Sequence, residues 1–476
     1  MLNTAKIAIV GGGVAGASTA LYLGQLGMNI TLFEKEQSLI SGPPFCHLHA
    51  GGNLYRDISD KQCLSLLRQS IDFLRFYPFI VDYRPTVIAL PIEDKAQPSD
   101  LLPRLHLLQE AYAKLIQKDP QNQVLGKSQD YYKSYSKSEI ERLKALPLPT
   151  CPQSADEWMI SLAKHIAIEK VQFPLILVQE YGLNLFRLAS GLRLSLSNIQ
   201  SLDLKMNTEI THIQASEEGY VLQYEDKKEY FDYLINATGF RSGKIDDILG
   251  ISCKQMVEFK SAYVSFCPEY EDIAFPELII HGERGTPQGM GQFTPYPQGY
   301  FQLHGMTHDI TLYKDGLVHN KPLRCQAQLP KVFLDKIEKS WTKEEIQERT
   351  LSAIAHLAKF IPSFSHALVA SKPLFGAQQI PGNDPSLRVA EVSFPKPHYA
   401  RCEIVKVSSV LDMIDAIVKD LIALGYVKKD AWKKRIFEQS IRLNESQIHS
   451  LAELIAQERM YPPALASRNR PKPNEL

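Results

Sequence analysis

The first 35 residues carry apolar runs and a glycine-rich stretch that together predict a strand, a helix and a second strand. Ile7–Val10 is apolar at every position, which is typical of a strand buried on both faces. A helix is expected from about Ala17 to Leu26, and Gly27 supplies its C-terminal stop. Ile30–Phe33 repeats the pattern of a buried strand. These elements form one βαβ unit.

Apolar residues at steps of three and four predict further helices. Ser59 or Asp60 can cap one of them, whose apolar stripe includes Cys63 and Leu67. Asn444 followed by Gln447 resembles a capping box at the start of a last helix. One further helix is therefore expected to begin at about residue 59. Others are expected at residues 101–115, 138–146, 410–421 and 444–455.

Runs of alternating or continuous apolar residues predict strands in the centre of the chain, at residues 86–90, 209–213, 220–224 and 233–235. From Ala262 to Thr311 the pattern is mostly β, and Pro297–Gly299 separates two runs as a hairpin turn would. Residues 118–152 are polar and interrupted by prolines, so we expect a surface insertion. The tail from Pro462 to Leu476 is rich in proline and is expected to be disordered.

Composition indicates a globular enzyme-sized chain with two lobes. A single hydrophobic core rarely exceeds about 250–300 residues, and this chain has 476. Lys plus Arg and Asp plus Glu both number 53, so the net charge of zero gives no support to nucleic-acid binding. Seven scattered cysteines without a C-x-x-C pair make a disulfide framework or a metal site unexpected. We find no transmembrane run and no signal-peptide layout, and we expect a cytoplasmic protein.

The glycines between the first strand and helix have the spacing of a dinucleotide-binding turn. Gly11 permits the tight turn, Gly13 lets a pyrophosphate approach the backbone, and Gly16 lets the helix pack on the strand. The helix N-terminus, with Val14 and Ala15, then offers free N–H groups to phosphates. Glu34 ends the second strand 34 − 11 = 23 residues after Gly11, where its carboxylate can accept hydrogen bonds from a ribose diol.

Residues 7–36 resemble the FAD-binding start of the D-amino-acid-oxidase-like (DAO) superfamily. Asn236–Phe240 is similar to a later family segment that passes the flavin again, and Glu209–Ile213 is similar to the strand whose backbone meets the adenine. His47–Tyr55 resembles the loop that lies along the isoalloxazine ring. The resemblance implies FAD as cofactor, held by the residues named above together with Lys35, His49, Ala50, Gly51, Ile210, Ala237 and Gly239. In some relatives a histidine placed like His49 is bound covalently to the flavin; we expect noncovalent FAD here.

The resemblance also implies an α/β fold with a discontinuous Rossmann-type FAD-binding lobe and a second, antiparallel-sheet substrate lobe. The FAD-binding lobe is expected from residues 1–76, 165–250 and 366–427. The substrate lobe is expected from residues 77–164, with a helical insertion, and 251–365. Residues 428–476 then form C-terminal helices and a tail.

Three residues outside the nucleotide motif are candidates for catalysis. Arg284 lies in a loop rich in glycine and proline, where its guanidinium could bind a substrate carboxylate or only a local partner such as Glu283. His304 ends a strand and could take a proton during dehydrogenation, or serve only as a hydrogen-bonded sheet residue. Lys406 could place a positive charge beside the flavin or be a solvated strand-end lysine.

The sequence thus predicts an FAD-dependent dehydrogenase or oxidase that takes a hydride from a C–N or C–O bond of a small amino or hydroxy acid. An FAD enzyme acting on a macromolecule such as tRNA and a non-catalytic FAD-binding relative are the alternatives. A basic cluster with interleaved aromatic residues indicates either a solvated helix face or peripheral contact with an anionic membrane: Lys428, Lys429, Trp432, Lys433, Lys434, Arg435 and Phe437. Substrate, electron acceptor and oligomeric state are left open.

Overall fold

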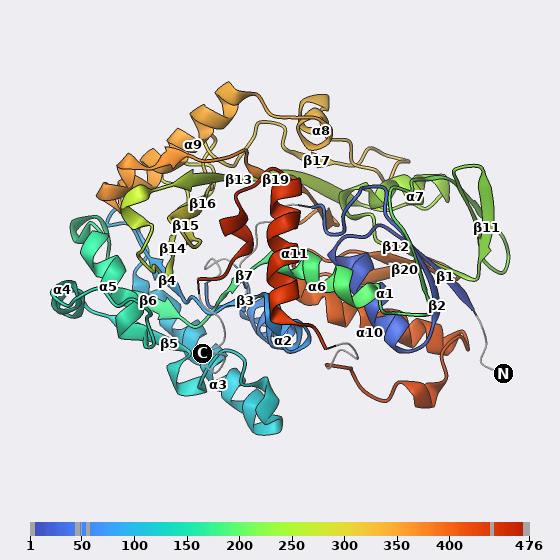
Figure 1. Ribbon diagram of the computed structural model, residues 1–476, viewed down its shortest axis with the longest axis horizontal. Coiled ribbons are helices and arrows are strands. Elements are labelled where there is room, and N and C mark those ends of the chain that lie inside the picture. Colours follow the sequence, from blue (N-terminus) through green and yellow to red (C-terminus); the bar gives the residue numbers. More distant parts are fainter. Residues whose placement is uncertain (1–4, 43–47, 49, 54–57, 438–441, 470–476) are drawn as a thin grey trace.

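The computed structural model describes residues 5–42, 48, 50–53, 58–437 and 442–469. Two β-sheets organise it into the six-stranded lobe and the ten-stranded lobe, which lie to the right and left of Figure 1. The two names are used below for each sheet with the helices that pack on it.

The six-stranded lobe is built on a mainly parallel sheet whose centre is the expected βαβ unit. β1 pairs in parallel with β2 on one side and β12 on the other. In spatial order the strands are β20 (Val392–Lys396), β21 (Tyr399–Cys402), β12 (Tyr233–Asn236), β1 (Lys6–Val10), β2 (Asn29–Phe33) and β8 (Leu202–Lys205). Strands distant in sequence meet here, because a parallel sheet is completed by crossover connections.

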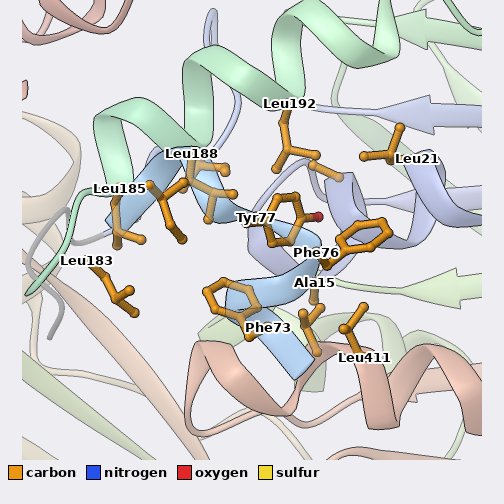
Figure 2. Packing of buried hydrophobic residues seen from close by; sticks show 14 of the residues in the cluster. Ala15, Leu21, Phe73, Phe76, Tyr77, Leu183, Leu185, Leu188, Leu192 and Leu411 are labelled. Atoms are coloured by element: carbon orange, nitrogen blue, oxygen red, sulfur yellow. The ribbon is translucent and has the colours of Figure 1, made fainter. Parts of the chain in front are cut away.

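Helices cover this sheet and share its core. The helix of the βαβ unit begins at Val14, three residues before the expected start. Figure 2 shows Tyr77 in the middle of the apolar cluster, and its hydroxyl lies 2.8 Å from Oγ of Ser18 in the first helix. The helices that contribute to this cluster are α1 (Val14–Gln25), α2 (Asp60–Phe76), α3 (Leu102–Lys118), α6 (Leu185–Leu196), α10 (Val410–Ala423) and α11 (Glu445–Glu458).

The ten-stranded lobe has a large, mainly antiparallel sheet in which β14 and β4 form a parallel pair. The main path of the sheet runs β17 (Leu317–His319), β13 (Gln255–Phe266), β16 (Tyr300–Gly305), β15 (Gly291–Pro295), β14 (Glu277–Ile280), β4 (Thr86–Ala89), β6 (Leu175–Val178) and β5 (Tyr132–Tyr135). β18 (Leu368–Val369) and β19 (Leu374–Pro381) also pair with β13. The hairpin of β15 and β16 is the one expected from the sequence.

One face of this sheet carries its hydrophobic core. Leu278, Phe293 and Leu303 pack there against α5 and α9. The remaining helices are α4 (Lys137–Lys144), α5 (Ala155–His165), α7 (Ser242–Ile248), α8 (Lys331–Glu338) and α9 (Lys343–Ala358). Residues on a strand alternate between faces, so the other face carries different side chains; at β4 and β6 it packs against Leu105 of α3.

Several expectations from the sequence meet a different local structure. The insertion at 118–152 contains β5, and its helix α4 buries Ile140 and Leu143 in the core of the ten-stranded lobe. β6 and β19, in segments expected in the FAD-binding lobe, pair within the large sheet. A strand pairs with a neighbouring strand that has free backbone N–H and C=O groups. The identity of that neighbour cannot be read from the pattern along the chain.

The expected disorder of the C-terminal tail is wrong for its first part. A short 3₁₀ helix, Pro463–Ala466, buries Leu465, and Asn469 donates to the side chain of Asp82 and to the carbonyl of Pro295. Asp82 precedes the large sheet and Pro295 belongs to β15. The tail is therefore held by hydrogen bonds that its composition does not show. β3 (Val81–Asp82) and β7 (Gly182–Leu183) form a small separate sheet beside it, and β9 (Ile210–Ala215), β10 (Tyr220–Tyr224) and β11 (Lys227–Phe231) form another.

Candidate functional site

The glycine turn after β1 has the geometry that a bound dinucleotide needs. Gly11 has φ +104°, and a Cβ on it would lie 2.5 Å from the carbonyl oxygen of Ala237. Both the backbone conformation and the lack of space therefore exclude a side chain. A Cβ on Gly16 would lie 1.9 Å from the carbonyl oxygen of Gly11, which explains the close packing of α1 on β1. At Gly13, by contrast, a Cβ would meet no atom within 4 Å. This open position is the place predicted for the pyrophosphate.

The N-terminus of α1 is suited to an anion. Gly13 is its N-cap, and the helix has neither a side-chain cap nor an acidic residue in its first turn. The backbone N–H groups of Val14 and Ala15 lie in the first turn of α1, where neither a capping side chain nor an acidic residue of that turn competes with a phosphate. The positive end of the helix dipole adds to the attraction.

Glu34 follows β2 and is 6% exposed. Its Oε2 accepts the N–H of Gly12 at 2.6 Å and its Oε1 accepts the N–H of Glu36 at 2.8 Å, while burial raises the pKa of the carboxyl. Each oxygen keeps a second lone pair, so the group can accept a ribose hydroxyl without losing its backbone contacts. The neighbouring Lys35 is exposed and pairs with Glu36, which leaves its cofactor role a prediction.

Of the two later segments that we expect at the cofactor, the one with Ala237 lies at the glycine turn, whereas the one with Ile210 lies in the three-stranded sheet. Ala237, at the end of β12, donates its N–H to the carbonyl of Val10, and Gly239 follows with φ +59°. Ala237 and the next residue, Thr238, border Gly11, because a Cβ on Gly11 would lie within 3.1 Å of both. Ile210 begins β9 in the three-stranded sheet and packs with the cluster that contains Phe33.

The loop expected along the isoalloxazine is described at Leu48 and at residues 50–53, whereas His49 lies outside the described residues. Gly51 has φ +109°, and a Cβ there would lie 2.8 Å from the carbonyl oxygen of Cys63 in α2. The N–H of Leu48 donates to the carbonyl of Tyr181. The loop thus lies between the helix α2 of one lobe and the segment after β6 of the other. Ala50 and Gly51 are held in a compact arrangement there.

The face of the large sheet opposite α5 and α9 carries a row of buried polar side chains. Gln292 and His304 are register partners on β15 and β16. Nε2 of Gln292 donates to the carboxylate of Glu277 at 2.6 Å, and Arg84 lies 3.3 Å from the same carboxylate. Burial raises the pKa of Glu277. These polar groups hydrogen-bond with one another, so this face carries a buried polar network where the opposite face carries the apolar core. The members of the row are Arg84, Glu277, Gln292, Thr294, Gln302 and His304.

Arg284, in the loop after β14, has a partner that the sequence did not indicate. Its Nη2 lies 2.5 Å from Oε1 of Glu258 on β13, and Lys260 lies 3.1 Å from the second oxygen of Glu258. Although burial raises it, the two cations hold the pKa of Glu258 at about 2. The three side chains therefore carry a net charge of +1. Arg284 is 49% exposed and lies on the wall of two cavities, of about 1180 Å³ and 240 Å³.

The structure brings Arg284 and His304 into one region but holds Lys406 on a different element. Nη1 of Arg284 lies 3.6 Å from Sδ of Met306, two residues beyond His304. Lys406 immediately precedes α10 and its short 3₁₀ start. Gln378 of β19 donates to the carbonyl of Val405, so the large sheet does reach the segment that carries Lys406.

Sequence reasoning missed Glu258, Glu277 and Glu180, a third buried carboxyl discussed below. Glutamates are common on surfaces, and each of these is recognisable only from its burial in the fold. The alternation of Gln292 with Phe293 and of His304 with Leu303 is the one signal along the chain that two strands have a polar face.

One group of an aspartate and two cysteines has the composition of a metal site, but its carboxylate already binds protein groups. Side chains of the basic C-terminal cluster bind protein groups as well. Asp246 lies with Cys253 and Cys325, but its two carboxylate oxygens already accept from Tyr399 and Arg401, which opposes a bound cation.

The aromatic side chains and the arginine of the basic cluster contact other parts of the protein. Trp432 donates to the hydroxyl of Tyr22, the guanidinium of Arg75 lies 3.8 Å from the ring centre of Phe437, and Arg435 forms ion pairs with aspartates. Those aspartates are Asp72, Asp412 and Asp415. None of the helices in the described part of the chain has both the length and the apolarity needed to cross a bilayer.

Comparison with known proteins agrees with this geometry. Residues 6–119 match the family model described as FAD dependent oxidoreductase (DAO). L-amino acid deaminase from Proteus vulgaris has 10% identity and a TM-score of 0.59, with 94% of this chain and 97% of that chain covered. Glycine oxidase from Geobacillus kaustophilus has 12% identity and a TM-score of 0.55, with 93% and 100% covered. L-alpha-glycerophosphate oxidase from Mycoplasma pneumoniae, with FAD bound, has 15% identity and a TM-score of 0.57, with 88% and 95% covered. A search of curated protein sequences found no match.

The fold is that of FAD-dependent oxidases and dehydrogenases, and it places the nucleotide turn at the end of β1. Residues 6–119, which contain this turn, match the FAD dependent oxidoreductase (DAO) family model, and FAD is the cofactor that this match indicates. The open position at Gly13, the uncapped helix and the buried carboxylate of Glu34 all fit the ADP part of that cofactor.

Proposed function

We propose that this chain removes a hydride from a C–N or C–O bond of a small amino or hydroxy acid. The flavin supplies the hydride acceptor when it is bound. The observation that carries the proposal is the net positive charge of Glu258, Lys260 and Arg284, which line the smaller cavity, while Arg284 also lines the larger one. Glycine oxidase, L-amino acid deaminase and L-proline dehydrogenase are among the proteins of similar fold, which supports a small acid as substrate.

In this proposal Arg284 binds the substrate carboxylate. One of its five N–H donors is committed to Glu258, and a guanidinium can bind two acceptors at different edges. Glu258 fixes the guanidinium in place, and Lys260 keeps the site cationic. Binding of an anion then needs little reorganisation of the loop that follows β14.

His304 is proposed to accept the proton that leaves the substrate nitrogen or oxygen. Its ring lies on the buried polar face and is 8% exposed, so water has little access to it. An imidazole suits this step because it titrates near neutral pH. Lys406 is proposed to place its charge near the flavin, as expected from the resemblance.

Anaerobic mixing of the purified yellow protein with a panel of amino and hydroxy acids tests the proposal. The expected result is loss of flavin absorbance with at least one acid and none with the corresponding amide or methyl ester, which lacks the carboxylate. Bleaching by uncharged esters as readily as by acids would reject the role of the cationic site. Bleaching by none of the acids, in a protein that dithionite reduces normally, would reject the substrate class.

A further inference from the structure

Glu180 is a fully buried carboxyl that lies between the two lobes. It follows β6 of the large sheet, and its exposed fraction is 0%. Oε1 accepts the N–H of Gly52 at 2.6 Å and the hydroxyl of Tyr131 at 2.8 Å, and Oε2 accepts the N–H of Asn53 at 3.3 Å. Its own carbonyl accepts the hydroxyl of Thr86 at 2.7 Å. One side chain thus binds the loop at residues 50–53 to the ten-stranded lobe.

The loop is shaped around this carboxyl. A Cβ on Gly52 would lie 2.8 Å from Oε1 of Glu180 and 3.0 Å from the hydroxyl of Tyr131, so only glycine admits the contact. Nδ2 of Asn53 donates to the carbonyl of Leu48 at 3.0 Å, which closes the loop on itself. On its other side, Gly51 touches Cys63 of α2. The loop has little freedom as long as the carboxyl of Glu180 is in place.

Burying a carboxyl without a compensating role is costly, since each of its oxygens must be satisfied inside the protein. Here the satisfied groups are two backbone amides of a single loop. Burial raises the pKa of Glu180 to about 7, although the hydrogen bonds from Tyr131, Gly52, Asn53 and Ala50 act in the opposite direction. The carboxyl therefore titrates near neutral pH.

We propose that Glu180 is a positioning residue for the cofactor, which holds the loop at residues 50–53 in the form that FAD binds. The proposal rests on the FAD site and not on the identity of the substrate. As a carboxylate, Glu180 accepts the hydrogen bonds from Tyr131, Gly52 and Asn53. Protonation turns one oxygen into a donor, which opposes an amide N–H and weakens its contact. The surroundings of the flavin then change with pH.

Few other described groups can account for such a change. Tyr131 and Cys63 are the titratable side chains that face Glu180 or its loop from β5 and α2. Burial raises the pKa of Tyr131 far above neutral and that of Cys63 to about 11, so both stay neutral. Leu105 of α3 is apolar. The histidines at positions 47 and 49 are distinguished from Glu180 by the variants below.

Glu180→Gln tests the proposal, because glutamine keeps the size of the side chain but presents a donor to one of the two loop amides. We expect at least tenfold weaker FAD binding, measured by flavin fluorescence. We also expect the visible circular dichroism of the bound flavin to titrate near pH 7 in the wild type and not in the variant. The matched control is Asp156→Asn, whose carboxylate accepts the hydroxyl of Tyr135 in the same lobe but outside the cofactor site. It should behave as the wild type.

An affinity within twofold of the wild type, with the titration retained, would overturn the proposal and assign the pH effect to another group such as a histidine. If Glu180→Gln does not fold, Tyr131→Phe serves instead. This variant removes one hydrogen-bond donor from the carboxylate, so the midpoint of the titration must move to higher pH. An unchanged midpoint would also overturn the proposal. A wild type that binds no FAD would refute both this proposal and the cofactor. A wild type that binds FAD but oxidises no acid refutes only the proposed substrate class.

Discussion

Arg284 and Glu258 form an ion pair that joins the loop after β14 to the strand β13, with 2.5 Å between Nη2 and Oε1. Because Lys260 binds the other oxygen of the same carboxylate, the arginine is oriented without being neutralised. This arrangement converts an exposed loop residue into an oriented cationic group at the mouth of two cavities.

Replacing Arg284 by alanine should raise the KM of an acid substrate and leave FAD content unchanged. Loss of two charge-assisted hydrogen bonds costs on the order of 1.5–3 kcal/mol, which is roughly a 10- to 150-fold effect. If the contact is equally strong in the ground and transition states, kcat stays constant. Steady-state kinetics measures this, with Arg142→Ala as a control, since Arg142 is also exposed and near a carboxylate, Asp156. Unchanged KM with a lowered Tm would give Arg284 a structural role only.

Gly13→Val should abolish FAD binding while the protein still folds. The Cβ of the added side chain would lie in open space at the N-terminus of α1, with no protein atom within 4 Å, and the side chain would block the pyrophosphate. Gly16→Val is the contrasting variant, because its Cβ would collide with the carbonyl oxygen of Gly11 and separate α1 from β1. Flavin absorbance and thermal melts check both. A yellow Gly13→Val protein would contradict the placement of the cofactor.

The stability of the protein should fall as pH rises from about 4.5 to 7, in part because of Glu180. Its pKa is raised from 4.5 to about 7 in the folded state, so the folded protein binds a proton that the unfolded chain releases in this range. The resulting loss in the free energy of unfolding is on the order of 3 kcal/mol and is complete above pH 7. Urea unfolding at several pH values should show a flatter dependence for Glu180→Gln than for the wild type. Parallel curves would show that Glu180 does not titrate there.

Acid precipitation should release the flavin and leave a colourless pellet, because the resemblance to relatives with a covalent histidine is confined to one short loop around His49. The supernatant should contain FAD, not FMN, as the ribose site at Glu34 requires the adenosine half. Flavin fluorescence that stays with the protein on a denaturing gel would instead indicate a covalent bond, and His49→Ala would then have to remove it.

The elements closest to the cofactor were predictable because their signals are local. The βαβ unit, the glycine turn and Glu34 occupy 35 consecutive residues, and steric limits at Gly11 and Gly16 act between immediate neighbours in the fold. The hairpin of β15 and β16 and the capped start of α11 were predictable for the same reason. Arg284 and His304 could be proposed as site residues from their types and their positions at strand ends.

The sequence by itself thus determined the class of cofactor, since a dinucleotide turn depends on residue spacing and on the absence of side chains. Only the tertiary structure decided which charges surround the substrate and the flavin loop. Glu180 and Gly52 are 128 positions apart in the chain, and Arg284, in the loop after β14, is 26 positions from Glu258 on β13. Hydrogen bonds and ion pairs act over about 3 Å in space, so such partners are set by the pairing of distant strands and leave no periodic trace along the chain.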